Sequence, residues 1–162
     1  MEYIDDIVLQ LNKLYWLNNS FGLARKMSHK GKYYPGILVG KEYKSMFPKT
    51  DYGNFSFIYQ DDPIQCKDLI NQMLYTIPLS IILWYDLSKI PNSTYESIKK
   101  DIIDNINQLT LTKGRFNLVR IYEKAENIYK GFNLSEQETQ FAMYPYGAIR
   151  LECEIKTINQ CL

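Results

Sequence analysis

The segment FAMYPYGAIRLECEIKTINQC, Phe141 to Cys161, contains the clearest strand pattern of the chain. In its second half, four apolar side chains alternate with four charged ones: Ile149, Leu151, Cys153 and Ile155 against Arg150, Glu152, Glu154 and Lys156. Alternation with a period of two is typical of a strand in an antiparallel sheet, with one face buried and the other polar. The segment therefore predicts a C-terminal strand, which the Tyr144-Pro145-Tyr146 turn introduces.

Further strands are predicted upstream of this segment. SIILWYDL, from Ser80 to Leu87, is a continuous apolar run, which is typical of a central strand buried on both faces. A short apolar strand is expected at 37–39, and Phe55, Phe57 and Tyr59 alternate along one face of another. Because a long segment lies between these strands, we expect an extended β-hairpin or arm over about 31–62.

Two main helices are predicted from apolar side chains at helical spacing, one in the first fifteen residues and one in the segment after Ser93. Ser93 with Glu96 three positions later matches a capping box. The segment 63–75 is expected to be a short helix or an irregular crossing. The segment NLVRIYEK at 117–124 is ambiguous, and we favour a strand that leads into a helical turn at 125–132.

One more short turn, capped by Ser135 with Glu138, is expected before the C-terminal strand. These elements predict an α+β fold, in which a mostly antiparallel sheet packs against two main helices. A length of 162 residues suits one domain, since single domains typically have roughly 100–200 residues. We therefore expect one domain over 1–162.

The charge and the apolar patterning of the sequence limit which partners the protein is expected to bind. Nineteen basic and eighteen acidic residues leave a formal charge of +1, which argues against a polyanion-binding surface as the main role. One local basic run, with Arg25, Lys26, Lys30 and Lys32, is either a contact for DNA phosphates or a solvated loop. We expect no membrane contact, because no apolar run approaches the roughly 20 residues that span a bilayer. The early charges exclude a signal peptide.

The sequence contains no pattern that favours an enzyme active site, a cofactor site or a metal site. His29, the single histidine, lies in a basic segment without a nearby carboxylate to orient it as a general base. The three cysteines have no metal-ligand spacing and are expected to be reduced thiols in a cytoplasmic product. The glycines form no phosphate-binding loop. An enzyme site assembled from scattered residues such as Asp61, Tyr85 and His29 remains the alternative.

The order of these elements resembles the tail-completion or tail-terminator subunits of tailed bacteriophages. The resemblance rests on the following segments, in this order: the first amphipathic helix, IPLSIILWYDL, TYESIKKDIIDNINQL, AENIYKGFNL and FAMYPYGAIRLECEIKTINQC. It implies a structural virion protein that forms a closed ring, commonly hexameric, at the neck. Its partners would be copies of itself and tail-tube or head-connector proteins, and DNA would pass through the lumen without being read. Assembly would take place in the host cytoplasm.

Aromatic side chains are the expected anchors of such a ring, because apolar interfaces are enriched in them. The residues predicted to contact a neighbouring subunit are Tyr52, Phe55, Phe57, Tyr144 and Tyr146. Arg150 would pair with a carboxylate of the neighbour. Core packing is the alternative for the aromatic residues, and a solvated strand position is the alternative for Arg150.

Two other functions stay open. The first is a different head–tail connector ring, either an adaptor or a stopper, including a ring of a short-tailed crAss-like phage. The second is a small nucleic-acid-binding accessory module that uses the basic run.

Overall fold

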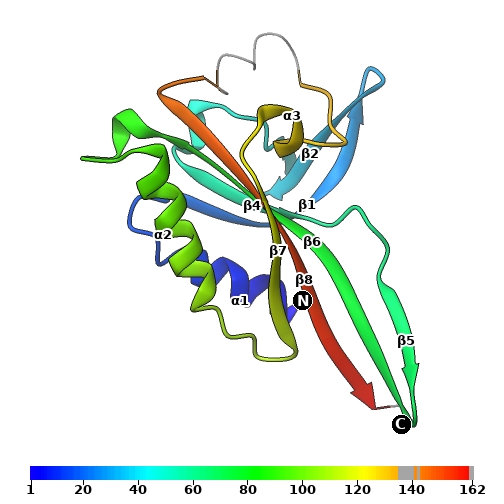
Figure 1. The fold of residues 1–162 in the computed structure, drawn as a ribbon. Helices are drawn as coiled ribbons and strands as arrows, with labels where there is room; N and C mark the ends of the chain where they lie inside the picture. Colours follow the sequence, from blue (N-terminus) through cyan, green and yellow to red (C-terminus); the bar gives the residue numbers. More distant parts are fainter. Residues whose placement is uncertain (135–140, 142, 161–162) are drawn as a thin grey trace.

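The structure is a computed structural model that describes residues 1–134, 141 and 143–160. Within these residues the chain forms three α-helices and one eight-stranded sheet (Figure 1). Every strand pair is antiparallel except the parallel pair of β1 and β4. The predicted α+β class with a mostly antiparallel sheet is confirmed. The predicted cap of Ser135 and Glu138 lies outside the described residues.

The helical elements are α1 (Glu2–Leu11), η1 (Thr50–Tyr52), η2 (Leu87–Lys89), α2 (Tyr95–Asn107) and α3 (Ala125–Ile128). The strands are β1 (Asn19–His29), β2 (Lys32–Val39), β3 (Glu42–Ser45), β4 (Phe55–Tyr59), β5 (Gln65–Leu69), β6 (Gln72–Asp86), β7 (Arg115–Tyr122) and β8 (Tyr146–Gln160). Their order in the sheet is β3-β2-β1-β4-β6-β8-β7, and β5 also pairs with β6.

The centre of the sheet is the long ladder between β6 and β8. Its register runs from Gln72 opposite Gln160 to Asp86 opposite Tyr146. The predicted C-terminal strand is thus confirmed, and the strand predicted at 80–87 is confirmed but begins earlier, at Gln72. On the other side of β6, β4 pairs with 80–84 and β5 with 72–76, so these two strands share one edge of β6.

One face of the sheet carries a hydrophobic cluster that we call the helix-side core. It joins the buried side of α1 to the buried side of α2 over alternate residues of β6 and β8. Its main members are Ile4, Ile7, Leu11, Trp16, Ile81, Leu83, Tyr85, Ile98, Ile102, Ile106, Leu151 and Cys153. The helices predicted from helical spacing and the strands predicted from alternation pack together here, because each element has one apolar face to bury.

The opposite face carries a second cluster, which we call the aromatic core. Trp84 lies at its centre, with ring centroids 5.8 Å from Phe55 and 5.2 Å from Tyr146. Phe57, Met46, Phe47, Ile128 and Tyr129 complete its main members. The sheet is therefore covered on both faces, which explains why β4 is buried along its whole length.

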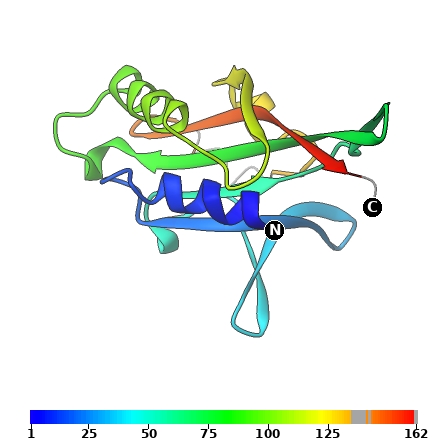
Figure 2. The same cartoon turned by 90° about the horizontal axis from the view of Figure 1, so that it is seen from below.

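The segment predicted to be one arm over 31–62 does not form a single arm. Its first part, β2 with β3, is an antiparallel hairpin whose turn projects from the rest of the chain (Figure 2). Its last part, β4, lies inside the main sheet between β1 and β6. The prediction failed because Phe55, Phe57 and Tyr59 are members of the aromatic core. An exposed arm would have left these three side chains in solvent.

Two local predictions are also corrected. The segment 63–75, expected to be a helix or an irregular crossing, forms β5 and the first part of β6. The cap of α2 is Thr94, whose hydroxyl accepts a hydrogen bond from the Ser97 amide while the Ser97 hydroxyl accepts one from the Thr94 amide. Ser93 instead donates its hydroxyl to the Ile90 carbonyl at 2.7 Å.

Candidate interaction surfaces

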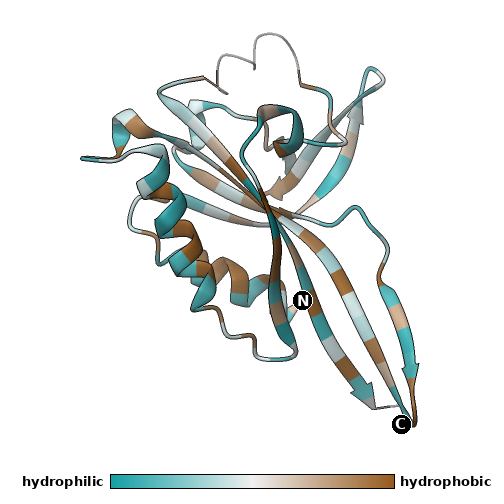
Figure 3. Ribbon diagram, in the orientation of Figure 1, coloured by the Kyte–Doolittle hydropathy of each residue, from teal (hydrophilic) through white to brown (hydrophobic). Residues whose placement is uncertain are grey.

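The far end of the β6–β8 ladder forms a surface that we call the distal ribbon, residues 64–76 and 156–159. Figure 1 shows it extending past the ends of both α1 and α2. Hydrophobic bands continue along β6 to this end (Figure 3). Ile64, Ile70 and Ile158 are exposed, Ile70 to 95% of its surface. Aliphatic side chains outside both cores contribute little to the stability of one subunit, so they favour contact with a partner.

The two outer strands on either side of this ladder have free edges among the described residues. β5 pairs only with β6, and β7 pairs only with β8. Since each neighbouring pair in the series β5, β6, β8 and β7 is antiparallel, β5 and β7 run in opposite directions. A free edge presents unpaired backbone groups that a strand of another molecule can join.

The β7 edge is basic, and acidic side chains precede β5. β5 itself contains Lys67 and Asp68, a formal charge of 0, and Asp61 and Asp62 lie in the segment before it, whereas β7 contains two arginines and no acidic residue, a charge of +2. Asp68, Arg115 and Arg120 are exposed. Arg120 lies opposite Glu152 in the ladder, whereas Arg115 lies opposite Lys156, which does not neutralise its charge.

The turn before β8 forms a second exposed surface. Tyr144 is 79% exposed, and its ring meets that of Tyr95 at 6.5 Å between centroids. The Tyr95 hydroxyl donates to the Tyr146 carbonyl at 2.8 Å, which ties α2 to the start of β8. Burial raises the pKa of Tyr95, and the negative charge that the neighbouring Tyr144 would carry as a phenolate raises it further. Of the predicted contact residues, Tyr144 is thus the one best placed to meet another subunit.

The other predicted aromatic contacts pack within the subunit. Phe55 and Phe57 have 0% of their surface exposed in the aromatic core, so the prediction that they contact a neighbour is corrected to core packing. Tyr146 stacks on Trp84 at an interplanar angle of 21°. Tyr52 packs edge-on against Phe21 at 5.3 Å, and the Lys49 ammonium lies 4.7 Å from its ring centre.

Arg150 has its hydrogen-bond partners within the same chain. Its Nε donates to Ser80 Oγ and its Nη1 to the Asn127 carbonyl, both at 3.0 Å. Its guanidinium also lies 5.3 Å from the ring centre of Tyr122. Arg150 thus links β8, β6 and the α3 segment, and its pairing with a carboxylate of a neighbour stays a prediction.

The four predicted phosphate contacts lie on the β1–β2 hairpin, and all four are exposed: Arg25, Lys26, Lys30 and Lys32. They belong to a larger basic surface that the sequence analysis missed, although the signal is a simple count of charges in a window. Residues 19–49, which we call the basic lobe, contain seven Lys or Arg residues and one Glu, a formal charge of +6. Because the whole chain carries +1, the remaining residues carry −5.

An open groove of about 390 Å³ lies on this lobe. His29, Lys32, Tyr33 and Tyr43 are among its lining residues, and none of those lining residues is acidic. The Lys26 ammonium lies 4.9 Å from the centre of the Tyr33 ring. The groove thus combines positive charge with partly exposed aromatic rings.

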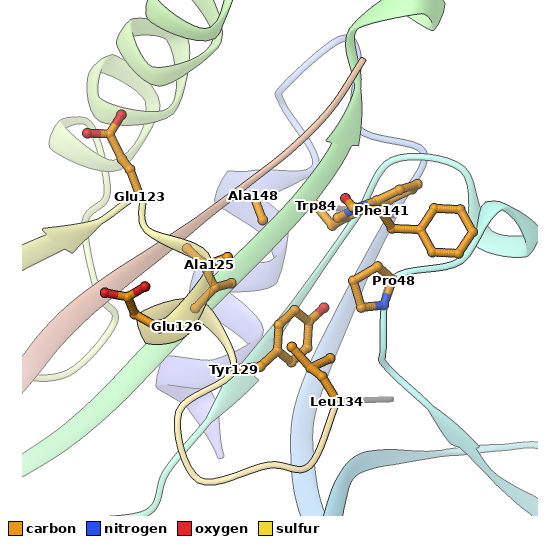
Figure 4. Close-up of a pocket in the computed structure, with 10 residues that line it drawn as sticks. Pro48, Trp84, Glu123, Ala125, Glu126, Tyr129, Leu134, Phe141 and Ala148 are labelled. Carbon is orange, nitrogen blue, oxygen red and sulfur yellow. The ribbon is translucent and has the colours of Figure 1, made fainter. Parts of the chain in front are cut away.

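An apolar cavity of about 190 Å³ lies between α3 and the aromatic core (Figure 4). Trp84, Tyr129 and Phe141 line it, and the carboxylates of Glu123 and Glu126 point away from these rings (Figure 4). Glu123 is paired with Lys99 at 3.0 Å. The cavity has no convergent set of polar groups of the kind that orients a small-molecule ligand.

A polar cavity of about 250 Å³ lies beside the gap between β4 and β5. Two of its carboxylates have hydrogen-bond partners in the chain: the Tyr59 hydroxyl donates to Asp61 at 3.1 Å, and the Tyr122 hydroxyl donates to Glu152 at 2.8 Å. Burial and the nearby Asp61 raise the pKa of Tyr59 to about 12. A phenol that keeps its proton this firmly is a poor general base at neutral pH.

The scattered enzyme site is not assembled. Tyr85 lies in the helix-side core, Asp61 lies beside the polar cavity, and His29 lies at the end of β1 next to the groove of the basic lobe. Burial raises the pKa of Tyr85. In the part of the chain that the structure describes, no group of three or more His, Cys, Asp and Glu side chains is arranged to hold a metal ion.

No model of a known protein family matches the chain, and no curated protein is significantly similar to it. Among the helices of the described residues, none has both the length and the apolar composition needed to cross a membrane.

Proposed function

We propose that the protein is a structural subunit that assembles head to tail into a ring at the head–tail junction of a tailed phage. The free edges of β5 and β7, which run in opposite directions, carry the proposal. A head-to-tail interface uses two different patches of each subunit and closes into a ring when the rotation between subunits allows it. The place at the neck rests on the resemblance in the order of elements.

Edge pairing is compatible with the direction of the strands. A second copy that continues the sheet would bring its β5 next to β7 of the first, and the two strands would run antiparallel because β5 and β7 are opposed within each subunit. Asp68 of β5, with Asp61 and Asp62 before the strand, would lie near the two arginines of the β7 edge. Such complementarity guides association and fixes which edges meet.

Exposed apolar side chains support the same interface. Ile70 and Ile158 on the distal ribbon and Val119 on β7 are exposed in the isolated subunit. Burying apolar surface contributes roughly 25 cal/mol per Å², so these side chains would stabilise the contact that the edges direct. The β2–β3 hairpin and Tyr144 remain available for tail-tube or connector partners.

Solution mass by light scattering tests this proposal. We expect a discrete ring-sized species whose fraction rises with protein concentration, and electron microscopy of that species should show closed rings. The measurement is repeated with phage tail tubes, to include the case of a ring that closes only on a template. The expected result there is a cap of the protein at the end of the tube. A protein that stays monomeric under both conditions contradicts the proposal.

A charge exchange identifies the interface. Asp68→Lys and Arg115→Glu should each weaken association by about tenfold or more per interface, since each places like charges at the junction. The double variant should recover association, because it restores opposite charges with the signs reversed. Lys89→Glu, an exposed change away from both edges, is the matched control. Equal effects of all three single changes would exclude the β5–β7 junction.

A further inference from the structure

The basic lobe is a second surface of the molecule, separate from the β5 and β7 edges. Of its seven basic side chains, Arg25, Lys26, Lys30, Lys32, Lys41 and Lys44 are exposed and Lys49 is half-buried. The salt bridges found among the described residues involve Lys99, Lys100, Lys113 and Lys156, all outside the lobe. The charge of the lobe is therefore not neutralised by ion pairs within the described part of the subunit.

We propose that the basic lobe binds single-stranded nucleic acid. The proposal goes beyond the ring subunit and does not depend on it, because it rests only on residues 19–49. Phosphates of a strand would contact the lysine and arginine side chains, and bases would stack on the tyrosine rings of the groove. Proteins that bind single strands without reading sequence combine these two features.

The tyrosines distinguish this ligand from a generic polyanion. Tyr33 is 48% exposed and Tyr43 is 39% exposed, so each ring offers surface for stacking. Tyr43 and Ser45 also line an adjoining hollow, whose charged lining residues are Lys44, Lys49 and Asp51. A duplex keeps its bases stacked inside and would use only the charges.

The geometry of the two hairpins holds these groups in place. The Lys30-Gly31 turn has positive φ at both residues, 48° and 75°, which matches the tight turn that joins twisted antiparallel strands. The register then places Ser28 opposite Tyr33 and Lys26 opposite Pro35. The cations of β1 and the rings of β2 thus lie on paired strands of a rigid hairpin.

An acidic surface of a second copy is the main competing partner, since the residues outside the lobe carry a formal −5. The exposed rings of Tyr33 and Tyr43 favour nucleic acid instead, because rings beside basic side chains serve base stacking and are not needed for charge pairing. The test separates the two partners.

Fluorescence anisotropy with a labelled oligothymidine is the direct test, and a duplex of the same length and polyglutamate are the reference ligands. We expect the single strand to bind more tightly than either. The logarithm of its binding constant should fall linearly with the logarithm of salt concentration, with a slope of about −3 for about four neutralised phosphates. Solution mass is measured in the same buffers.

Two sets of variants assign the binding to the groove. Tyr33→Ala and Tyr43→Ala should each weaken oligothymidine binding by about 5- to 100-fold and leave polyglutamate unaffected, since stacking is worth about 1–3 kcal/mol per base. Lys26→Gln with Lys32→Gln should weaken both ligands and reduce the salt slope. Tyr15→Ala and Lys89→Gln, both exposed and outside the lobe, are the matched controls, and circular dichroism checks the fold.

Each outcome decides the question. Binding that is lost in the tyrosine variants while the solution mass is unchanged supports the proposal, whether or not the protein forms rings. Equal affinity for polyglutamate and no effect of Tyr33→Ala would overturn it in favour of a general polyanion surface. If the lysine variants change the solution mass but not oligothymidine binding, the lobe is an interface between copies and the proposal is wrong.

Discussion

At the scale of single residues, Asn54 organises the end of the sheet. It is almost fully buried, and its side chain donates to the Trp16 carbonyl at 2.9 Å and accepts from the Asp86 amide at 2.8 Å. Its backbone carbonyl accepts from the amides of Asn18 and Asn19. The side-chain amide and the backbone carbonyl of one residue thus satisfy backbone groups of the segment after α1, the start of β1 and the end of β6.

Replacing Asn54 should therefore be costly. Asn54→Ala leaves a buried carbonyl and a buried amide without partners, and each orphan costs about 1–3 kcal/mol. We expect the free energy of unfolding to fall by about 2–4 kcal/mol in urea titrations. Asn107→Ala, at an exposed position of α2, is the matched control and should change it by less than about 0.5 kcal/mol. Equal losses in the two variants would mean that Asn54 is not an organising residue.

Tyr59 predicts how stability depends on alkaline pH. Its pKa is raised from 10.0 to about 12 in the folded protein, so the native state holds this proton more tightly than the unfolded chain. The contribution is complete below pH 10 and is lost as the pH rises toward 12. Over that interval the loss reaches about 2–3 kcal/mol.

The Tyr59→Phe variant tests this dependence. It has no phenol to ionise, so its free energy of unfolding should fall less steeply than that of the wild type between pH 10 and 12. Tyr15→Phe, which changes an exposed ring, serves as the matched control and should keep the wild-type slope. Parallel curves for Tyr59→Phe and wild type would show that Tyr59 does not govern this range.

At the scale of elements, α2 depends on a reciprocal cap that the sequence suggested one residue too early. Ser-x-x-Glu at 93–96 and Thr-x-x-Ser at 94–97 both offer a hydroxyl three positions before a polar side chain. Geometry decides between them, because Ser93 is already bonded to the Ile90 carbonyl in the turn after η2. The sequence pattern at 93–97 does not show that turn, so the pattern alone could not decide between the two caps.

The cap gives a prediction for α2. Thr94→Ala should lower the free energy of unfolding by about 1 kcal/mol. Ser97→Ala should have a related effect, and the double variant should cost less than the sum, because both side chains serve one capping box. Thermal and urea unfolding measure this, with Thr110→Ala in the exposed segment after α2 as the control. Strict additivity would contradict a shared cap.

Elements that bury one full face were predictable, and elements with little burial were not. β8 followed from the alternation of Ile149, Leu151, Cys153 and Ile155, and α1 from its apolar stripe, because each periodicity records a buried face. β1 and β5 lack such a record. All side chains of β1 except that of Ala24 are exposed or half-buried, and those of β5 are exposed except for the half-buried Leu69, so their sequences resemble loops.

The predicted subunit contacts at Phe55 and Phe57 were wrong for a related reason. Aromatic composition does not separate an interface from a core, and the second core became visible only when β4, α3 and Phe141 met around Trp84. The exposure of the Tyr144 side chain could be predicted from its place in the turn next to Pro145. The basic lobe was predictable in kind from Arg25 to Lys32, but its extent to Lys49 follows from the folding of β3 beside β2.

At the scale of the whole molecule, stability should decline along the sheet toward the distal ribbon. Residues 80–84 of β6 lie between β4 and β8 and are covered on both faces, whereas 72–76 lie between β5 and β8 beyond the main members of the two cores. Local opening is easiest where few apolar contacts hold a segment. The ribbon is thus the part best suited to adjust to a partner.

Hydrogen exchange measures this gradient. In dilute protein, the amides of 80–84 should exchange most slowly and those of 72–76 much faster, even though both belong to one strand. In the assembled state, amides of β5 and β7 should gain protection, since edge pairing would bond them. Uniform protection along β6 in the dilute protein would contradict the gradient, and unchanged β5 and β7 amides in rings would place the junction elsewhere.

The separation of the two cores by a single sheet has an optical consequence. The chain has two tryptophans, and they lie on opposite faces, Trp16 in the helix-side core and Trp84 in the aromatic core. Each face therefore contains its own intrinsic fluorophore. Trp16→Phe and Trp84→Phe would give a pair of single-reporter proteins whose emission follows each half of the molecule without an added dye. Coincident or staggered spectral transitions would then reveal whether the sheet couples its two faces into one cooperative unit.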